Sequence, residues 1–208
     1  MQTLWQDLRF GLRMLFKKPG FTLIAIITLA LGIGANTTIF SVVNGVLLKP
    51  LPYVAPEQLV RVYERSQSQP KFPLAGGNFQ DYRDQNTTLN GFALYTRGDL
   101  ELSQDNRPER LAALRISAGF FDVLGVRPLL GREFSREDEL PDKTSVVILS
   151  HALWQRRFNS DPNIIGKTLM LSAQPFTIVG VMPAGVQHVG GDYRSMPHGE
   201  SVDAWWPV

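Results

Sequence analysis

The residues that come closest to a chemical motif are Gly166, Lys167 and Thr168, which have the composition of the end of a phosphate-binding loop. In that motif an earlier glycine, five residues before the Gly-Lys pair, lets the backbone wrap around the phosphates. Here Asp161 occupies that position and Pro162 follows it. A carboxylate repels phosphate, and proline has no N–H to donate. We therefore interpret Gly166 as a turn glycine before a hairpin and expect no nucleotide site.

Metal binding and nucleophilic catalysis are the other two functions for which the sequence offers candidate side chains. Carboxylates between Glu137 and Asp142 suit calcium or magnesium, but their spacing matches no calcium loop, so we expect a solvated loop. The histidines lack metal-ligand spacing, Ser150 points away from His151 in either regular structure, and there is no Gly-x-Ser-x-Gly element and no cysteine. The sequence predicts no catalytic residue, no metal site, no cofactor and no enzymatic activity. The acidic and histidine candidates are Glu137, Asp138, Glu139, Asp142, His151, His188 and His198.

Composition narrows the class of protein further. The chain has 208 residues, of which 44% are hydrophobic and 19% charged, enough for one modest domain with an accessory segment and not typical of a disordered protein. The net charge is +2, and residues 1–18 contribute +3, so the remainder carries −1. A nucleic-acid surface needs clustered basic residues on the folded part, so we expect no nucleic-acid partner. Trp154 is expected in the core, whereas Trp205 and Trp206 are left open between core and surface.

The strongest pattern is an uncharged segment near the N-terminus. No charged side chain stands between Pro19 and Leu48, and most positions from Phe21 onward are apolar. As a helix, residues 21–48 reach roughly 42 Å, more than the roughly 30 Å hydrocarbon core of a bilayer requires. We therefore expect a transmembrane helix over 21–48, with the lipid bilayer as its environment.

The residues before this segment decide its orientation. Four cations precede the span and only Lys49 follows it closely, so the positive-inside rule places residues 1–20 in the cytoplasm and residues 50–208 outside it. Within residues 1–20, apolar residues recur at helical spacing, which predicts an amphipathic leader at the inner membrane interface. Pro19 is expected to separate this leader from the span. The cations are Arg9, Arg13, Lys17 and Lys18, and the apolar positions are Trp5, Leu8, Leu12, Leu15 and Phe16.

A cleavable signal peptide is the alternative for this segment. Lys17 and Lys18 would form its basic region, residues 21–31 its apolar region and residues 32–34 a small-residue cleavage site. The apolar run resumes after that site, and the leader is longer than such a basic region usually is. We therefore expect a retained anchor, and a secreted soluble domain is the consequence of the alternative.

Residues 49–208 have the pattern of a mixed domain. Alternating residues predict a strand over 59–64, and Asn78 is the expected cap of the helix that follows. Strands and helices then mix without a regular βαβ rhythm, so the fold class is α+β. Further strands are expected at 100–103, 110–116, 146–149, 168–171 and 176–181, and helices at 119–124 and after the cap Ser150.

Several segments of the chain resemble MacB/FtsX-type ABC transporter permeases, and within them the large duplicated orphan permeases. The likeness covers essentially the whole chain. Near the N-terminus it rests on residues 4–9, 18–22, 30–36 and 48–53. The segments that resemble the family's MacB-like periplasmic core domain are residues 119–125 (Gly-Phe-Phe-Asp-Val-Leu-Gly), 131–134, 153–158, 165–167 and 179–183.

The resemblance implies a first membrane helix, an extracytoplasmic α+β domain that is incomplete here, and three further helices. We therefore expect an N-terminal fragment of a permease subunit in the cell inner membrane. Such permeases have no ATPase of their own, and a separate ABC ATPase subunit drives their periplasmic movement for export or mechanotransmission. The implied partners also include a second permease half or protomer and periplasmic or outer-membrane proteins.

A single-pass membrane receptor with an extracytoplasmic sensor domain is the alternative function. Three further hydrophobic spans encoded in frame after Val208 would favour the permease, whereas a cytoplasmic kinase or methyl-accepting segment would favour the receptor. We expect residues 1–208 alone to be inactive in transport, because a lone span cannot form the family's helix bundle.

Overall fold

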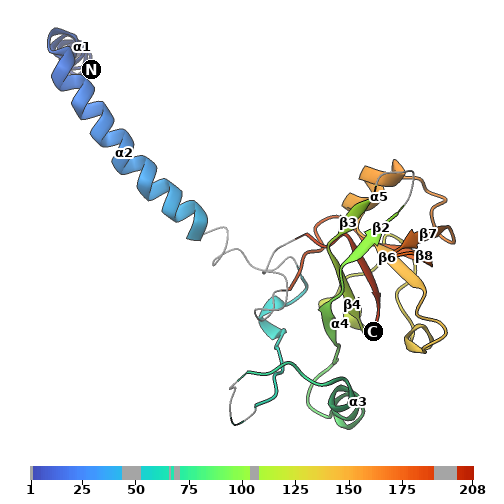
Figure 1. Cartoon of the computed structure of the whole chain (residues 1–208). Coiled ribbons are helices and arrows are strands. Elements are labelled where there is room, and N and C mark those ends of the chain that lie inside the picture. The colour runs from blue at the N-terminus through green and yellow to red at the C-terminus, as the bar shows by residue number, and fades with distance from the viewer. Residues whose placement is uncertain (1, 44–52, 66, 68–70, 104–107, 190–200) are drawn as a thin grey trace. The chain divides into compact units, whose positions relative to one another are not determined.

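The computed structural model describes residues 2–43, 53–65, 67, 71–103, 108–189 and 201–208 (Figure 1). The chain divides into two compact units, one of residues 1–50 and one of residues 51–208. Each unit has its own structure and is described by itself.

The first unit consists of two helices, α1 (Gln2–Lys17) and α2 (Pro19–Val43). Pro19 begins α2, where its missing N–H costs no hydrogen bond, so the expected break between leader and span is confirmed. At the junction the Thr22 hydroxyl donates to the carbonyl of Leu15 at 2.8 Å. The expected span extends to residue 48, and its last five residues lie outside the described part of the chain.

Helix α2 exposes an almost wholly apolar surface. Residues Pro19–Ser41 form a helix of 23 residues that is long and apolar enough to cross a membrane, and none of its most apolar window is buried in the protein. Ile24 and Leu31 leave 67% and 69% of their surface exposed. Water opposes such exposure, whereas about 35 Å of apolar helix matches the hydrocarbon core of a bilayer.

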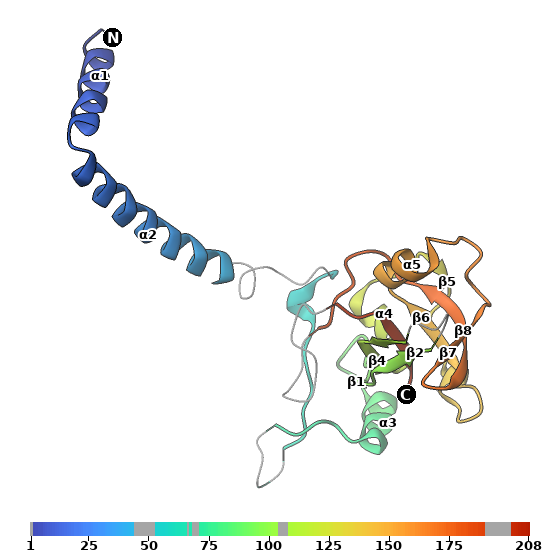
Figure 2. The same cartoon turned by 45° about the horizontal axis from the view of Figure 1, so that its top comes forward.

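The described residues of the second unit form nine strands and several short helices. Helices α4 (Phe120–Leu124) and α5 (His151–Phe158) lie against the sheet, as Figures 1 and 2 show. The helical elements are η2 (Pro56–Gln58), α3 (Gly76–Gln85), α4 (Phe120–Leu124), η3 (Arg136–Glu139) and α5 (His151–Phe158). The strands are β1 (Tyr95–Arg97), β2 (Leu100–Leu102), β3 (Glu109–Leu111), β4 (Ala113–Ile116), β5 (Leu130–Gly131), β6 (Val146–Leu149), β7 (Thr168–Leu171), β8 (Gln174–Val181) and β9 (Ala204–Pro207).

One bent hairpin closes the sheet on itself. The register of β1 with β4, in which Tyr95 pairs with Ile116, continues unchanged into that of β2 with β3, in which Leu102 pairs with Glu109. The strand order β1-β4-β9-β6-β8-β7-β2-β3 therefore begins and ends on the same hairpin. β4 pairs with β9 on one side, and β2 pairs with β7 on the other. The result is a small barrel-like sheet, in which closure leaves little free strand edge.

Two clusters of buried side chains fill the unit, one on each side of β9. Trp206 packs against the first cluster, with Leu153 and Trp154 from α5, and Trp205 belongs to the second, with Phe121 from α4. Adjacent residues of a strand point to opposite faces, so the two tryptophans divide between the two clusters. Trp205 is 1% exposed, and the expected core position of Trp154, 9% exposed, is confirmed.

Most of the expected elements are present, and the structure confirms an α+β fold. The cap of α5 is confirmed, because the Ser150 hydroxyl accepts from the backbone N–H of Leu153 at 3.1 Å. Two expectations are wrong. Asn78 lies inside α3, whose cap is Ala75, and its amide donates to the Glu64 carboxylate. Residues 59–64 form no strand, and only Glu64 makes an isolated bridge, to Phe72.

A buried carboxylate holds the loop that follows β5. Asp138 accepts hydrogen bonds from the Arg132 guanidinium at 2.6 and 3.0 Å and from the backbone N–H and hydroxyl of Ser135 at 2.7 and 2.9 Å. Burial alone would raise the pKa of Asp138, but these donors outweigh it and lower the pKa below its ordinary value.

We predict that Asp138→Asn lowers the free energy of unfolding at pH 7 by about 1.5–3 kcal/mol, because Arg132 loses its charged partner. The pKa of Asp138 is lower in the folded protein than its unfolded value of roughly 3.9, so the ionised carboxylate stabilises the folded state above that pH. This stabilisation is lost as the pH falls through the native pKa. The difference between wild type and variant, measured by urea denaturation, therefore shrinks below about pH 4. Glu137→Gln, on a carboxylate 77% exposed, is the matched control and changes little. An undiminished difference at acid pH would contradict the assignment.

Two glycines with positive φ differ in the space around them. Gly131 has φ +74°, and a Cβ there would stand 2.1 Å from the Val179 carbonyl oxygen in β8, whereas Gly166 has φ +84° and open space. We predict that Gly131→Ala costs about 3–5 kcal/mol of stability, through both strain and collision, and that Gly166→Ala costs about 1–2 kcal/mol through strain alone. Thermal unfolding followed by circular dichroism measures both. Equal losses would show that the β5–β8 contact is looser than described.

Candidate functional site

The phosphate-loop candidate is a turn between a loop and a strand. Gly166 donates its N–H to the Ile178 carbonyl at 2.8 Å, and Thr168 begins β7. The Lys167 ammonium lies 2.5 Å from the Asp161 carboxylate, which lowers the pKa of Asp161 through that hydrogen bond. A cation bound to a carboxylate does not cradle phosphate. The structure therefore agrees with the turn interpretation.

The carboxylates of the acidic loop point in different directions. Asp138 turns inward to Arg132, and Glu137 lies 3.4 Å from Lys143 at the surface. Glu139 accepts from the backbone N–H of Ala118 at 2.7 Å. Within the described residues, no three carboxylate or histidine side chains come together as a metal site would require.

The serine and histidine candidates are also separated. Ser150 caps α5, and His151 begins that helix with its ring edge-on to Trp154. His188 is buried and packs edge-on against Tyr95. His198 lies outside the described residues. The described part of the chain also has two hollows in its surface, neither of which was expected from the sequence.

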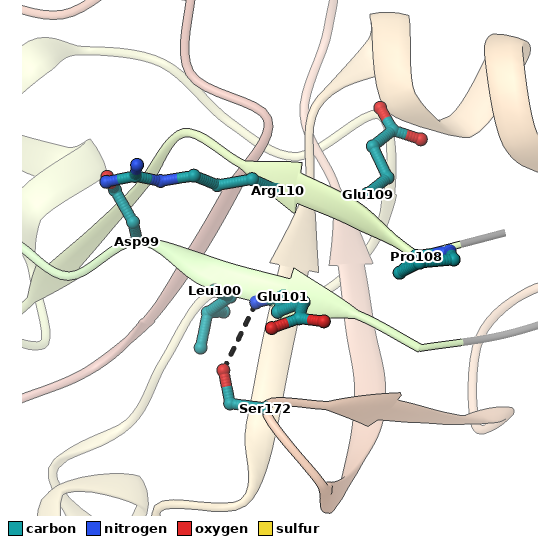
Figure 3. A pocket seen from close by; sticks show the side chains of 7 residues that line it. All are labelled: Asp99, Leu100, Glu101, Pro108, Glu109, Arg110 and Ser172. Carbon is teal, nitrogen blue, oxygen red and sulfur yellow. Dashed lines mark hydrogen bonds and ion pairs between the residues drawn. The ribbon is translucent and has the colours of Figure 1, made fainter.

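The first hollow, which we call the Asp99 pocket, lies where the hairpin bends (Figure 3). It measures about 460 Å³ and is lined by polar side chains from β2, β3 and the β7–β8 turn. The Arg110 guanidinium reaches Asp99, and the Ser172 hydroxyl accepts from the backbone N–H of Glu101 at 3.1 Å. The lining residues are Asp99, Leu100, Glu101, Pro108, Glu109, Arg110 and Ser172.

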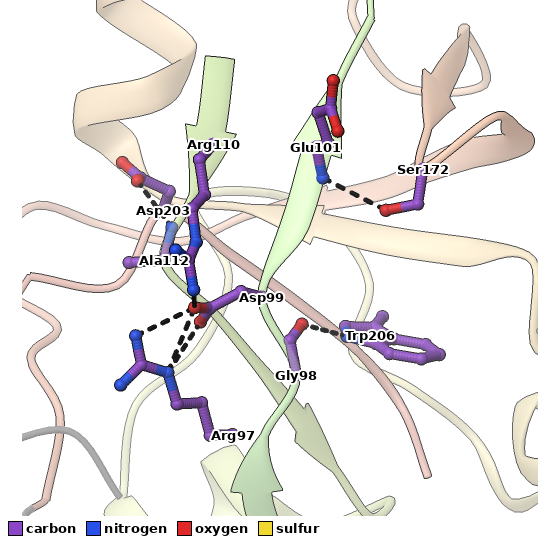
Figure 4. A network of polar contacts seen from close by, with 9 residues as sticks. All are labelled: Arg97, Gly98, Asp99, Glu101, Arg110, Ala112, Ser172, Asp203 and Trp206. Carbon is purple, nitrogen blue, oxygen red and sulfur yellow. Dashed lines mark hydrogen bonds and ion pairs between the residues drawn. The ribbon is translucent and has the colours of Figure 1, made fainter. Parts of the chain in front are cut away.

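Several charges of this pocket are held in ion pairs, either with one another or with arginines beside the pocket (Figure 4). Arg97 and Arg110 each bring a guanidinium nitrogen within 2.8 Å of the Asp99 carboxylate. Burial opposes the ionisation of Asp99, but the hydrogen bonds from both arginines prevail and its pKa is lowered. Glu109 is bound by Arg156 of α5 at 2.5 Å. This arrangement holds the bend of the hairpin.

The second hollow is larger and lies beside the segment Val54–Glu64, which we call the strap; it contains η2 and is extended from Leu59 onward. The hollow, the strap groove, measures about 1620 Å³. Tyr53 anchors the start of the strap, since its hydroxyl bonds to the backbone of Gln187 and burial raises its pKa. Farther along, the Arg61 guanidinium donates to the Val189 carbonyl at 3.1 Å and lies 5.4 Å from the centre of the Tyr95 ring.

The walls of the strap groove combine apolar side chains with positive charge. Four arginines and a single aspartate, Asp122, line it, and its apolar residues come from the strap, the loop before β1, and α4. Burial and the charge of Asp122 raise the pKa of the neighbouring Glu133. The groove is thus suited to an elongated, partly anionic ligand. The arginines are Arg61, Arg83, Arg97 and Arg136, and apolar residues of the walls include Val54, Leu59, Val60, Val62, Leu74, Leu89, Phe92, Val123 and Leu124.

Comparison with solved structures finds similar domains of bacterial transport proteins. The periplasmic region of MacB from Actinobacillus actinomycetemcomitans has 18% identity and a TM-score of 0.50, over 71% of this chain and 61% of that one. The extracellular domain of the noncanonic ABC-type transporter YknZ from Gram-positive bacteria has 15% identity and a TM-score of 0.49, over 65% and 63%. A domain of a putative permease from Porphyromonas gingivalis has 20% identity and a TM-score of 0.44, over 65% and 58%.

These likenesses differ in what they support. The chain spans about three fifths of the length of these solved domains, and at 18% identity the likeness to MacB shows the fold alone. A comparison with curated proteins gives no significant match.

The family assignment comes from sequence. A model of the MacB-like periplasmic core domain matches residues 22–203, which include most of α2 and nearly all of the second unit. Proteins of this family are components of ABC-type transporter permeases rather than typical enzymes. The apolar N-terminal helix and the mixed sheet domain of this chain agree with that match. The chain therefore belongs to the MacB-like periplasmic core domain family.

Proposed function

We propose that this chain is part of the permease subunit of a MacB/FtsX-type ABC transporter. In this proposal a separate ATPase subunit hydrolyses ATP in the cytoplasm, and the extracytoplasmic domain changes conformation for export or mechanotransmission. The observation that carries the proposal is that one family match extends over both the apolar helix and the sheet domain, residues 22–203.

The proposed domain arrangement follows from charge and hydropathy. Residues 1–20 form a cytoplasmic amphipathic leader, residues 21–48 cross the inner membrane, and residues 49–208 form the periplasmic core domain. Helix α2 supports the crossing because most of its side chains are apolar and none is charged. The four cations in residues 9–18 support a cytoplasmic N-terminus through the positive-inside rule.

The second unit has a rigid structure, which suits a domain that transmits movement. Its sheet closes on itself, and both clusters of buried side chains share β9, so a force on one strand is resisted by the whole unit. Such a unit moves as a rigid body more readily than it deforms. This supports a mechanical role in which an ATPase cycle acts from a distance.

A ligand-sensing single-pass receptor is the alternative function. The observation that favours it is the strap groove, which has a volume of about 1620 Å³ and walls that combine apolar and cationic side chains. The two functions require different cytoplasmic partners, which makes the partner the decisive observation.

We predict that a membrane-impermeant maleimide labels Lys143→Cys in intact spheroplasts and labels Lys17→Cys only after permeabilisation. The chain contains no cysteine, so each variant carries a single reporter thiol, and Lys143 is 55% exposed. Gel-shift counting of labelled chains measures the result. Reversing the charges of Arg9, Arg13, Lys17 and Lys18 is expected to weaken or invert the pattern when Lys143→Cys is the reporter. Labelling of Lys17→Cys in intact spheroplasts would refute the orientation.

We predict that cross-linking in native membranes, followed by affinity capture of the full chain, recovers an ABC ATP-binding subunit. Mass spectrometry of the captured proteins identifies the partner, and capture of an unrelated single-span protein from the same membranes is the control. Recovery of a cytoplasmic kinase or methyl-accepting protein in place of the ATPase would favour the receptor.

A further inference from the structure

The strap has the composition of a β-strand and lacks a strand partner. Val60, Val62 and Tyr63 are residue types that favour strands, and the two valines alternate with Arg61 and Tyr63. Yet the only ladder contact of the strap in the described structure is at its end, where Glu64 and Phe72 exchange backbone hydrogen bonds of 2.9 and 2.8 Å. A strand-forming sequence is thus held extended beside a groove.

One edge of the strap is open. In an extended chain alternate residues direct their N–H and C=O groups to the same edge, so Val60 and Val62 share the edge on which Glu64 bonds to Phe72. Among the described residues, the backbone groups of Val60 and Val62 have no hydrogen-bond partner. Their side chains are 67% and 37% exposed.

The chain itself turns away from this edge. An antiparallel ladder continued from the Glu64–Phe72 bridge would place Leu74 opposite Val62. The backbone N–H of Ala75 instead donates to the Glu64 carboxylate at 3.2 Å, and α3 begins at Gly76. Within the described residues, the edge therefore has no strand partner and could pair with another polypeptide segment.

The charge of the groove indicates what kind of segment fits. Four arginines against Asp122 leave its lining with a net charge of +3. Arg83 and Arg97 contact carboxylates outside the lining, Glu139 and Asp99, whereas Arg136 is exposed and makes no ion pair with the described residues. Acidic side chains are therefore favoured over basic ones in any occupant.

We propose that the strap groove is a strand-addition site for an extended segment of a partner protein in which apolar and acidic residues alternate. Its backbone pairs with Val60 and Val62. Alternate side chains of a strand point to opposite faces, so its carboxylates face the arginines of the groove and its apolar side chains lie beside the exposed valines. A lipid chain has no N–H and C=O groups to satisfy the open edge. A second copy of the strap would bring its own Arg61 toward a groove already rich in arginine.

The test uses the full chain in detergent micelles and a fluorescent peptide of alternating valine and glutamate. Fluorescence anisotropy is expected to show saturable binding, weakened at least ~10-fold when lysine replaces glutamate, which corresponds to about 1.4 kcal/mol. N-methylation of alternate peptide nitrogens is expected to abolish binding, because it removes the donors of the ladder. Absence of saturable binding, or equal binding of all three peptides, would overturn the proposal.

Variants of the chain locate the site. Val62→Pro removes the donor N–H and is expected to weaken binding at least ~10-fold, whereas Val62→Thr keeps the donor and is expected to bind normally. Arg136→Glu is expected to weaken binding of the acidic peptide, with Lys143→Glu, outside the groove, as its control. Circular dichroism shows whether each variant is folded, and the N-methylated peptide tests the edge without any substitution.

Hydrogen exchange and sedimentation separate this occupant from a second copy. The amides of Val60 and Val62 are expected to exchange rapidly in the free chain and to be protected by the peptide. A concentration-dependent dimer that Val62→Pro abolishes would assign the edge to a second copy and overturn the proposal, as would protection of both amides in the free monomer.

Discussion

The second unit depends on the bend in the hairpin that forms both ends of its sheet. One pair of strands has to meet β9 on one side and β7 on the other, which requires a change of direction at Gly98 and Asp99. The Asp99 carboxylate draws Arg97 and Arg110 together across that bend, and the Trp206 indole donates to the Gly98 carbonyl at 2.8 Å. Because these contacts join β9 to the bend, they link closure of the sheet to both clusters of buried side chains.

The closed sheet also explains why the strap lies outside the ladder. The strands of the sheet satisfy most of one another's hydrogen-bonding groups, whereas the strap is held by the Tyr53 anchor, the Arg61 contacts, the Glu64–Phe72 bridge and the hydrogen bonds to the Glu64 carboxylate. The second unit therefore combines a rigid closed sheet with an extended segment on its surface. The first suits the mechanical role that we propose for a permease domain, and the second suits recognition of another polypeptide.

Some features of the protein follow from local sequence because they need only local physics. The uncharged run after Pro19 produces an apolar helix regardless of its surroundings, and the prolyl ring alone is enough to separate it from α1. Ser150 caps α5 through a contact only three residues away. The hairpin of β7 and β8 was also predicted, although its turn is tighter than expected, with Ser172 and Ala173 both at positive φ. The turn at Gly166 was likewise predicted from the local sequence.

Tertiary structure decided the features that depend on distant partners. The segment Leu59–Glu64 alternates as a strand should, but strand formation needs a neighbouring backbone, and within the described residues only Phe72 supplies one. No local pattern could place Trp205 and Trp206 on a strand between two buried clusters or bring Arg97, Asp99 and Arg110 together, because those arrangements arise only when the sheet closes. The sequence by itself determined the apolar helix, the α+β class and the family likeness, since each rests on residue type and short spacing. The closed sheet, the Asp99 pocket and the strap groove required the whole chain, because each is formed by segments that meet only through folding.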